Sequence, residues 1–122
     1  MSKERVAVLG ASPKSERYSN KAIKALEARG HQVFPVNPAY EEIDGKRVYQ
    51  DLSSLPDKID TLTIYVSPQK ISGYMEEIIK LAPGRIIINP GTESEELSRE
   101  LDKAGITHLE ACTLVMLSTK QF

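Results

Sequence analysis

Short apolar runs alternate along this chain with longer polar stretches that contain regularly spaced apolar residues. The first run, at residues 6–9, ends at Gly10, and β-branched or aliphatic runs recur four more times. Continuous apolar runs of this length are typical of strands that are buried on both faces of a parallel sheet. We therefore predict five strands, at residues 6–9, 32–36, 61–66, 85–88 and 107–111.

The stretches between these runs carry signals that start and stop helices. Ser19 suits an N-cap, and Ser67 followed by Pro68 is a common way for a helix to begin. Thr92 and Glu95 have the spacing of a capping box. We predict helices at 20–29, from 68 to about 81 and from the Thr92 cap to 104, a short helix within 113–122, and an irregular segment with one helical turn at 39–58.

Strands that alternate with helices need crossover connections, and these connections are right-handed in almost every known case. The pattern therefore predicts an α/β fold, with a Rossmann-like, doubly wound, parallel five-stranded sheet and helices on both faces. The expected strand order is 3-2-1-4-5. No repeat, linker or low-complexity run interrupts the pattern, so residues 1–122 are expected to form one domain.

Composition narrows the functions that such a fold is expected to serve. With 16 basic against 17 acidic residues and a net charge of -1, the chain lacks the basic excess that general nucleic-acid binding requires. Its longest apolar runs have four residues, far fewer than the roughly 18 of a membrane span. The basic start also lacks the apolar region of a secretory signal. We therefore expect a cytoplasmic protein that binds neither nucleic acids nor membranes.

Ligands of doubly wound sheets bind across the carboxyl ends of the strands, and in this chain those ends carry small, polar or turn-forming residues. The loop after the first strand is the most informative. Its small residues let backbone N–H groups approach a phosphate, and the next helix offers the positive end of its dipole. Lys14, Arg17 and Ser19 add side-chain donors, which favours phosphate binding over a purely structural turn.

The same loop lacks the signatures of other nucleotide-binding folds. A G-x-G-x-x-G motif needs glycine where Ser12 and Ser15 stand, and the second strand ends at Asn37 instead of the acidic residue that takes the ribose of NAD. The chain also contains no G-x-x-x-x-G-K-[ST] loop. An NAD(P)-binding enzyme or redox sensor is therefore an alternative with less support.

Three segments together, at residues 6–12, 17–19 and 33–38, resemble the small stand-alone CoA-binding protein family. These proteins are similar to the CoA-binding N-terminal domain of the succinyl-CoA synthetase alpha subunit. The resemblance covers essentially the whole chain, and it implies that the ligand is CoA or an acyl-CoA.

By position, the resemblance also implies which residues surround CoA. Its phosphates would lie beside Gly10, Ala11, Ser12, Lys14, Arg17 and Ser19. Tyr18, which stands where many members of the family have proline, is also counted among the binding residues. Asn37, Pro38 and Tyr40 would border the adenosine, Val66, Ser67 and Pro68 the pantetheine, and Asn89, Pro90 and Gly91 its inner end. Cys112, at the end of the fifth strand, is expected to be a small buried hydrophobe, with a mixed disulfide to CoA as the alternative.

The sequence offers no residue set with a recognisable catalytic or metal-binding spacing. His31 follows the first helix and His108 is expected inside the fifth strand, so neither joins Cys112 in a metal site. No serine, histidine and acid are expected to meet at the strand ends. We therefore expect a CoA-binding module that is not an enzyme and holds no metal. An interaction subunit with a vestigial nucleotide cleft is a further alternative.

Overall fold

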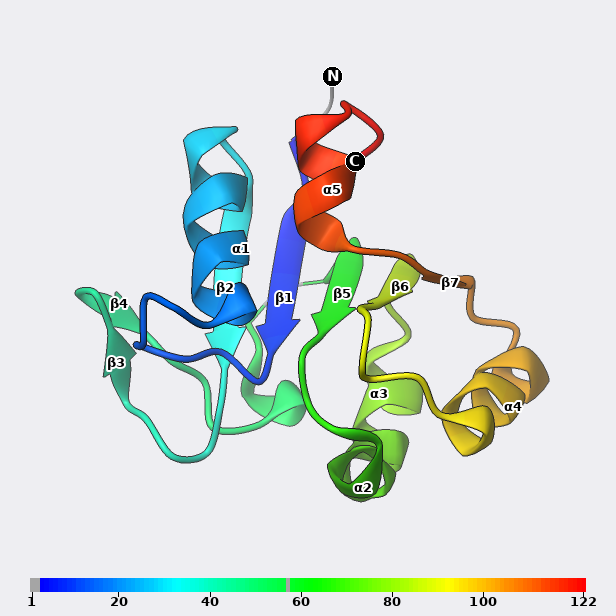
Figure 1. Cartoon of the computed structure of the whole chain (residues 1–122). Coiled ribbons are helices and arrows are strands. Elements are labelled where there is room, and N and C mark those ends of the chain that lie inside the picture. The colour runs from blue at the N-terminus through cyan, green and yellow to red at the C-terminus, as the bar shows by residue number, and fades with distance from the viewer. Residues whose placement is uncertain (1–2, 57) are drawn as a thin grey trace.

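The computed structural model describes residues 3–56 and 58–122, so Met1, Ser2 and Asp57 of the predicted domain lie outside the described residues. Within these ranges, five strands form a parallel sheet in the order β2-β1-β5-β6-β7 (Figure 1). They are β1 (Arg5–Leu9), β2 (Gln32–Val36), β5 (Thr61–Ile64), β6 (Arg85–Ile88) and β7 (His108–Glu110). The predicted α/β fold with a five-stranded parallel sheet is confirmed.

Helices cover both faces of this sheet, as predicted (Figure 1). One face carries α1 (Tyr18–Ala28) and α5 (Thr113–Ser118), and the other carries α3 (Met75–Leu81) and α4 (Glu95–Ala104). The short α2 (Pro68–Ile71) and the 3-10 turn η2 (Ser72–Tyr74) lead into α3. The helix predicted from 68 to 81 is therefore present as three consecutive segments.

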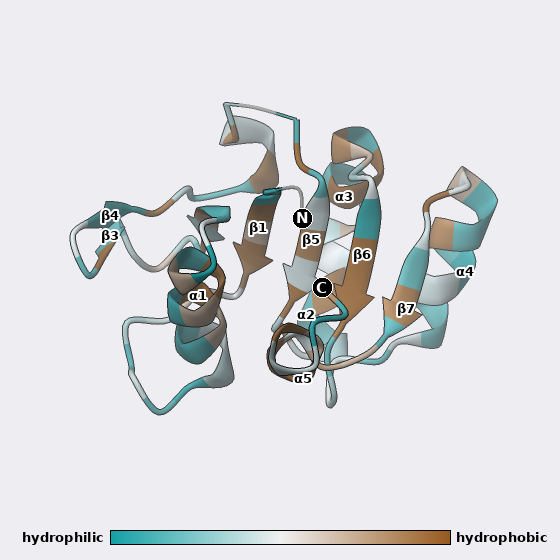
Figure 2. Cartoon of the chain, turned by 90° about the horizontal axis from the view of Figure 1, so that it is seen from above, coloured by the Kyte–Doolittle hydropathy of each residue, from teal (hydrophilic) through white to brown (hydrophobic). Residues whose placement is uncertain are grey.

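The residues of β1 show how the sheet is buried on both faces. Val6 and Val8 join the apolar cluster beneath α1 and α5, whereas Ala7 and Leu9 join the larger cluster on the side of α3 and α4. All four side chains are fully buried, and Figure 2 shows the largely hydrophobic β1 and β6 in a row of strands between the flanking helices. Successive strand residues point to opposite faces, which explains the continuous apolar run.

The strand order differs from the predicted 3-2-1-4-5. Counted over the five sheet strands, it is 2-1-3-4-5, because β2 lies at an edge and β5 pairs with the other side of β1. Pro35 within β2 explains this position, since proline has no N–H and cannot complete the hydrogen bonds of an interior strand. The edge is covered at one point, where the Tyr49 N–H donates to the Pro35 carbonyl at 2.9 Å.

The segment between β2 and β5 is more regular than predicted. A hairpin of β3 (Glu42–Ile43) and β4 (Lys46–Arg47) turns at Asp44 and Gly45, whose φ angles are 50° and 81°. Positive φ at both central residues is what a tight two-residue hairpin turn requires, and Asp-Gly is a favoured pair there. The 3-10 turn η1 (Leu52–Ser54) supplies the predicted helical turn.

The beginnings of α1 and α2 bear on the site. α2 starts at Pro68 after Ser67, as predicted. α1 starts two residues earlier than predicted, with Arg17 at the N-cap, so Ser19 lies inside the helix and does not cap it.

The start of α4 also differs from the predicted capping box. Ser94 is the N-cap, and its Oγ accepts a hydrogen bond from the Leu97 N–H at 3.2 Å. The Thr92 hydroxyl is engaged elsewhere, because it donates to the Asn89 carbonyl at 2.7 Å.

Among the helices of residues 3–56 and 58–122, none has the length and hydropathy that a bilayer crossing would need.

Candidate functional site

The order in which the chain adds strands to the sheet reverses at β1, which is the topological switch point of the fold. From β1 the chain passes to β2 on one side, and it then returns to place β5 on the other side of β1. The loops that follow β1 and β5 therefore diverge, and this is where doubly wound sheets bind their ligands.

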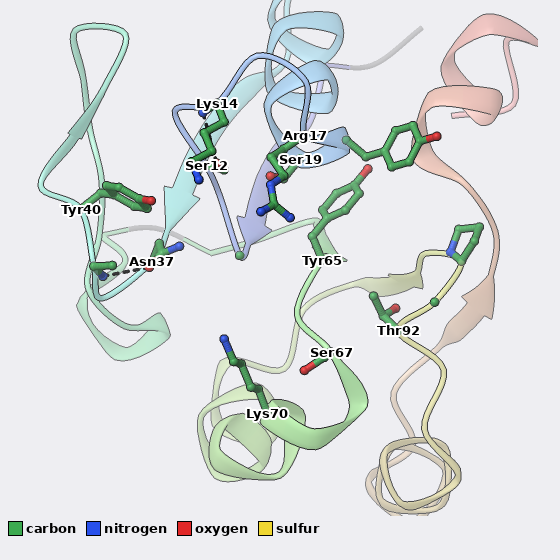
Figure 3. Close-up of a pocket in the computed structure, with 15 residues that line it drawn as sticks. Ser12, Lys14, Arg17, Ser19, Asn37, Tyr40, Tyr65, Ser67, Lys70 and Thr92 are labelled. Carbon is green, nitrogen blue, oxygen red and sulfur yellow. Dashed lines mark hydrogen bonds between the residues drawn. The ribbon is translucent and has the colours of Figure 1, made fainter.

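A pocket of about 610 Å³ lies at this point, which is within the usual range for small-molecule sites. Loops at the carboxyl ends of β1, β2, β5 and β6 form its walls (Figure 3). Its lining residues are Gly10, Ser12, Lys14, Arg17, Tyr18, Ser19, Asn37, Ala39, Tyr40, Tyr65, Ser67, Lys70, Pro90, Gly91 and Thr92.

Gly10 brings the β1 loop and the β5 loop together at the base of this pocket. Its φ is +91°, and a Cβ at this position would lie 3.0 Å from the backbone carbonyl carbon of Tyr65. The N–H groups of Gly10 and Ala11 both donate to the Val36 carbonyl, at 3.0 and 3.2 Å. These two amides therefore hold the loop against β2 and are not available to a phosphate, contrary to the expectation that the loop's amides would be open to the ligand.

The donors open to an anion come instead from the start of α1. The first N–H groups of any helix have no partner within it. In α1 no side chain caps them, and no acidic residue lies in the first turn. The 11-residue helix thus presents uncapped donors and the positive end of its dipole at the pocket. Asn20 fixes this helix to the loop, because its Nδ2 donates to the Ser12 carbonyl at 2.8 Å.

Three cationic side chains, Lys14, Arg17 and Lys70, line the pocket, and no aspartate or glutamate is among its lining residues. None of the three forms an ion pair with another residue in the described ranges. Figure 3 shows Arg17 and Lys70 extending into the pocket from opposite walls. The site therefore combines uncompensated positive charge with an uncapped helix start.

Asn37 has a structural task at the end of β2. Its Nδ2 donates to the Ala11 carbonyl at 2.8 Å, and its Oδ1 accepts from the Ala39 N–H at 2.8 Å. Asn37 therefore connects the β1 and β2 loops, although it also lines the pocket. Asn37 also lacks the carboxylate that binds the paired ribose hydroxyls in NAD-dependent proteins.

Asn89 is a buried junction behind the pocket. Its Nδ2 donates to Thr63 Oγ1 at 2.7 Å and to the Ile64 carbonyl at 2.9 Å, and its Oδ1 accepts from the Thr113 N–H at 2.9 Å. The amide thereby joins β5, β6 and the start of α5. Its capacity is used within the protein, so Asn89 supports the site from outside the pocket lining.

Tyr65 adds an apolar ring to the pocket wall and buries its hydroxyl among polar neighbours. Burial raises the pKa of this phenol to about 12, an effect that the nearby Thr113 and Thr63 hydroxyls partly oppose. Among the described residues, the Tyr65 hydroxyl has no well-aligned hydrogen-bond partner. Tyr65 therefore stays protonated and neutral in the physiological pH range.

The structure brings most of the predicted binding residues together around the pocket. Eleven of them line it: Gly10, Ser12, Lys14, Arg17, Tyr18, Ser19, Asn37, Tyr40, Ser67, Pro90 and Gly91. Six lie outside the lining: Ala11, Pro38, Val66, Pro68, Asn89 and Cys112. Ala11 and Val66 are buried in the core, and half-buried Cys112 occupies the N-cap of α5.

Sequence reasoning missed four lining residues, which are Ala39, Tyr65, Lys70 and Thr92. Lys70 is the most consequential of them, because it is charged. It lies three residues after Ser67, so the first turn of α2 places it beside a residue that was predicted. The start of a helix immediately after a strand end is the signal that could have identified it.

The two histidines lie outside the pocket lining. His31 Nδ1 accepts a hydrogen bond from the Glu4 N–H at 3.0 Å, and His108 Nε2 lies 2.8 Å from Asp102 Oδ1. His108 is the first residue of β7, at an edge of the sheet, rather than inside the strand as predicted. Over residues 3–56 and 58–122, no three histidine, cysteine or acidic side chains are grouped closely enough to hold a metal ion.

The parallel sheet and the pocket at its switch point define a Rossmann-like α/β domain. Comparison with known families assigns it more closely, because the model for the CoA binding domain matches residues 4–118. The chain therefore belongs to the CoA-binding domain family.

Several individual proteins are similar to this chain. The uncharacterized protein YneT of Bacillus subtilis is 27% identical over 104 residues, which cover 85% of this chain and 77% of YneT. An ADP-forming acetate–CoA ligase of Archaeoglobus fulgidus is 30% identical over 125 residues, which cover 94% of this chain but 18% of the ligase. Among solved structures, a hypothetical protein of Pyrococcus horikoshii superposes with a TM-score of 0.90 at 33% identity, covering 96% of this chain and 83% of that one.

Proposed function

We propose that this chain binds CoA or an acyl-CoA in the switch-point pocket and performs no reaction on it by itself. The observation that carries the proposal is the pocket's charge: three cations, no acidic side chain in the lining, and the uncapped start of α1. Such a site suits a ligand with several phosphates. Membership of the CoA-binding domain family identifies CoA as the polyphosphate to test first.

The walls around this charge suit the other parts of the ligand. Asn37 and Tyr40 lie at the end of β2, where doubly wound sheets hold the adenosine. Ser67, Gly91 and Thr92 line the pocket at the ends of β5 and β6, on the opposite side of β1 from β2. The uncharged residues on this side provide a path for pantetheine.

The proposal that the chain has no chemistry of its own rests on which residues line the pocket. Its described lining contains no histidine, cysteine or carboxylate to serve as a nucleophile or general base. The Tyr65 phenol, with a pKa of about 12, is too weak an acid to supply a nucleophilic oxygen near neutral pH.

Isothermal titration with CoA tests the binding proposal directly. We expect saturable binding with one site per chain, and undetectable binding at millimolar CoA would refute it. Titrations with NAD(H) and NADP(H) separate CoA from the dinucleotide alternative, against which Asn37 counts because it stands in place of an acidic residue. Mass spectrometry of the small molecules released on denaturing protein purified from its host would identify the acyl group.

A role as an interaction subunit is the second candidate, and the match to a ligase of which this chain spans 18% favours it. In that case the nucleotide cleft would be vestigial, and an exposed surface of the chain would dock on a larger partner. A stable hetero-complex recovered with the tagged protein, together with a pocket that binds no CoA, would support this candidate over the first.

A further inference from the structure

The pocket distributes its three cations over distinct regions, and Lys14 occupies the region beside β2. The Lys14 N–H donates to Ser12 Oγ at 3.2 Å, and the neighbouring Ala11 carbonyl accepts from Asn37 Nδ2 at 2.8 Å. This part of the loop is therefore tied to the end of β2. Figure 3 shows Lys14 on the same side of the pocket as Asn37 and Tyr40.

Arg17 and Lys70 occupy the region between β1 and β5. Arg17 is the N-cap of α1, and Lys70 lies in α2, across the switch point. Both side chains are exposed, and in Figure 3 their charged ends point from opposite walls into the same space. An anion that sits in front of Gly10, at the start of α1, would have a cation on either side.

The two regions match two different phosphate groups of CoA. In doubly wound sheets the diphosphate lies at the turn after the first strand, and the ribose lies near the end of the second strand. CoA differs from dephospho-CoA by one phosphate on that ribose, which adds about two negative charges at neutral pH. A cation beside β2 is therefore placed to distinguish the two compounds, whereas cations beside α1 are not.

We propose that Lys14 binds the ribose phosphate of CoA and that Arg17 and Lys70 clamp its diphosphate. This division rests on the proposed CoA-binding function and adds to it a selectivity for adenine nucleotides with a phosphorylated ribose. Lys14 is then the residue that sets selectivity, and Lys70 contributes affinity without selectivity.

The experiment is a titration of CoA and of dephospho-CoA into the full chain and three variants, Lys14→Met, Lys70→Met and Lys24→Met. Lys24 is an exposed residue of α1 outside the pocket lining, so its replacement makes the same change in charge without touching the site. Because all three lysines are exposed, the variants should fold, and their melting temperatures verify this.

We expect the wild type to bind CoA about tenfold more tightly than dephospho-CoA, since one charge-assisted contact is worth roughly that factor. Lys14→Met should remove this preference by weakening CoA alone. Lys70→Met should weaken both compounds about equally, and Lys24→Met neither.

Three results would overturn the division of roles. These are equal binding of the two compounds by the wild type, equal weakening of both by Lys14→Met, and loss of the preference in Lys70→Met. If the wild type binds neither compound, the proposed function itself fails. That outcome is distinct, because it is seen before any variant is compared.

Discussion

Replacing Gly10 by alanine tests the close approach on which the pocket is built. Gly10 has a φ of +91°, and an added Cβ would lie 3.0 Å from the Tyr65 carbonyl carbon and 3.1 Å from its oxygen. Both atoms belong to the backbone, so they cannot rotate away as a flexible side chain would. The β5 loop would have to move, or the β1 loop would have to lose its hydrogen bonds to Val36.

The expected loss in the free energy of unfolding has two parts, and a second variant separates them. A non-glycine residue at positive φ costs about 1–2 kcal/mol, and forcing an atom into a well-packed region costs about 1–3 kcal/mol more. Gly45, in the β3–β4 turn, has a φ of +81° but has no atom within 4 Å of its added Cβ. Gly45→Ala should therefore show the first cost alone, and Gly10→Ala both.

Urea unfolding at 25 °C measures the two free energies of unfolding. We expect Gly10→Ala to lose about 2–5 kcal/mol and Gly45→Ala about 1–2 kcal/mol, with unchanged m-values. If the two variants lose the same free energy, the contact between the β1 and β5 loops is not what requires glycine at position 10, and the reasoning fails.

Three further predictions concern the polar groups in and behind the pocket. Asn89→Ala removes three buried hydrogen bonds and should lower the free energy of unfolding by about 3 kcal/mol; a loss below about 1 kcal/mol would contradict the role of Asn89 as a junction. Burial raises the pKa of Tyr65 in the folded protein from 10 to about 12. The protonated phenol therefore stabilises the fold fully below pH 10, and this stabilisation is lost as the pH rises toward 12. Tyr65→Phe should therefore reduce the alkaline loss of stability in urea unfolding at pH 9 and 11, and an unchanged loss would refute the assignment. Raising KCl from 0.05 to 0.5 M should weaken CoA binding in titration calorimetry, because salt screens Lys14, Arg17 and Lys70; a constant Kd would show that these cations do not contact the phosphates.

The strands and the tight turn after β1 were predictable because both are encoded locally. The apolar run of β1 follows from burial on two faces, and Gly10 follows from the turn out of that strand. The strand order was mispredicted although its signal was present, since Pro35 marks β2 as an edge strand. A single proline thus contains information about the neighbours of its strand as well as about the strand itself.

The use of polar side chains was harder to predict than their positions. Asn37 and Asn89 were both placed at the ligand by the family resemblance, yet their amide groups form hydrogen bonds within the protein. Lys70 was missed because its place in the pocket depends on β5 lying next to β1. Sequence identifies which groups can form hydrogen bonds, but only the arrangement of the strands shows which groups are already engaged.

The charge of the pocket also connects binding to stability. The chain as a whole has a net charge of -1, yet Lys14, Arg17 and Lys70 share one pocket whose described lining holds no acidic side chain. A polyanion bound in this pocket would neutralise all three at once, and only in the folded protein, because the unfolded chain does not hold these residues together. A ligand present at 100 times its Kd therefore stabilises the fold by about 2.7 kcal/mol. Thermal unfolding in the presence of candidate nucleotides would then rank them by affinity without a catalytic assay.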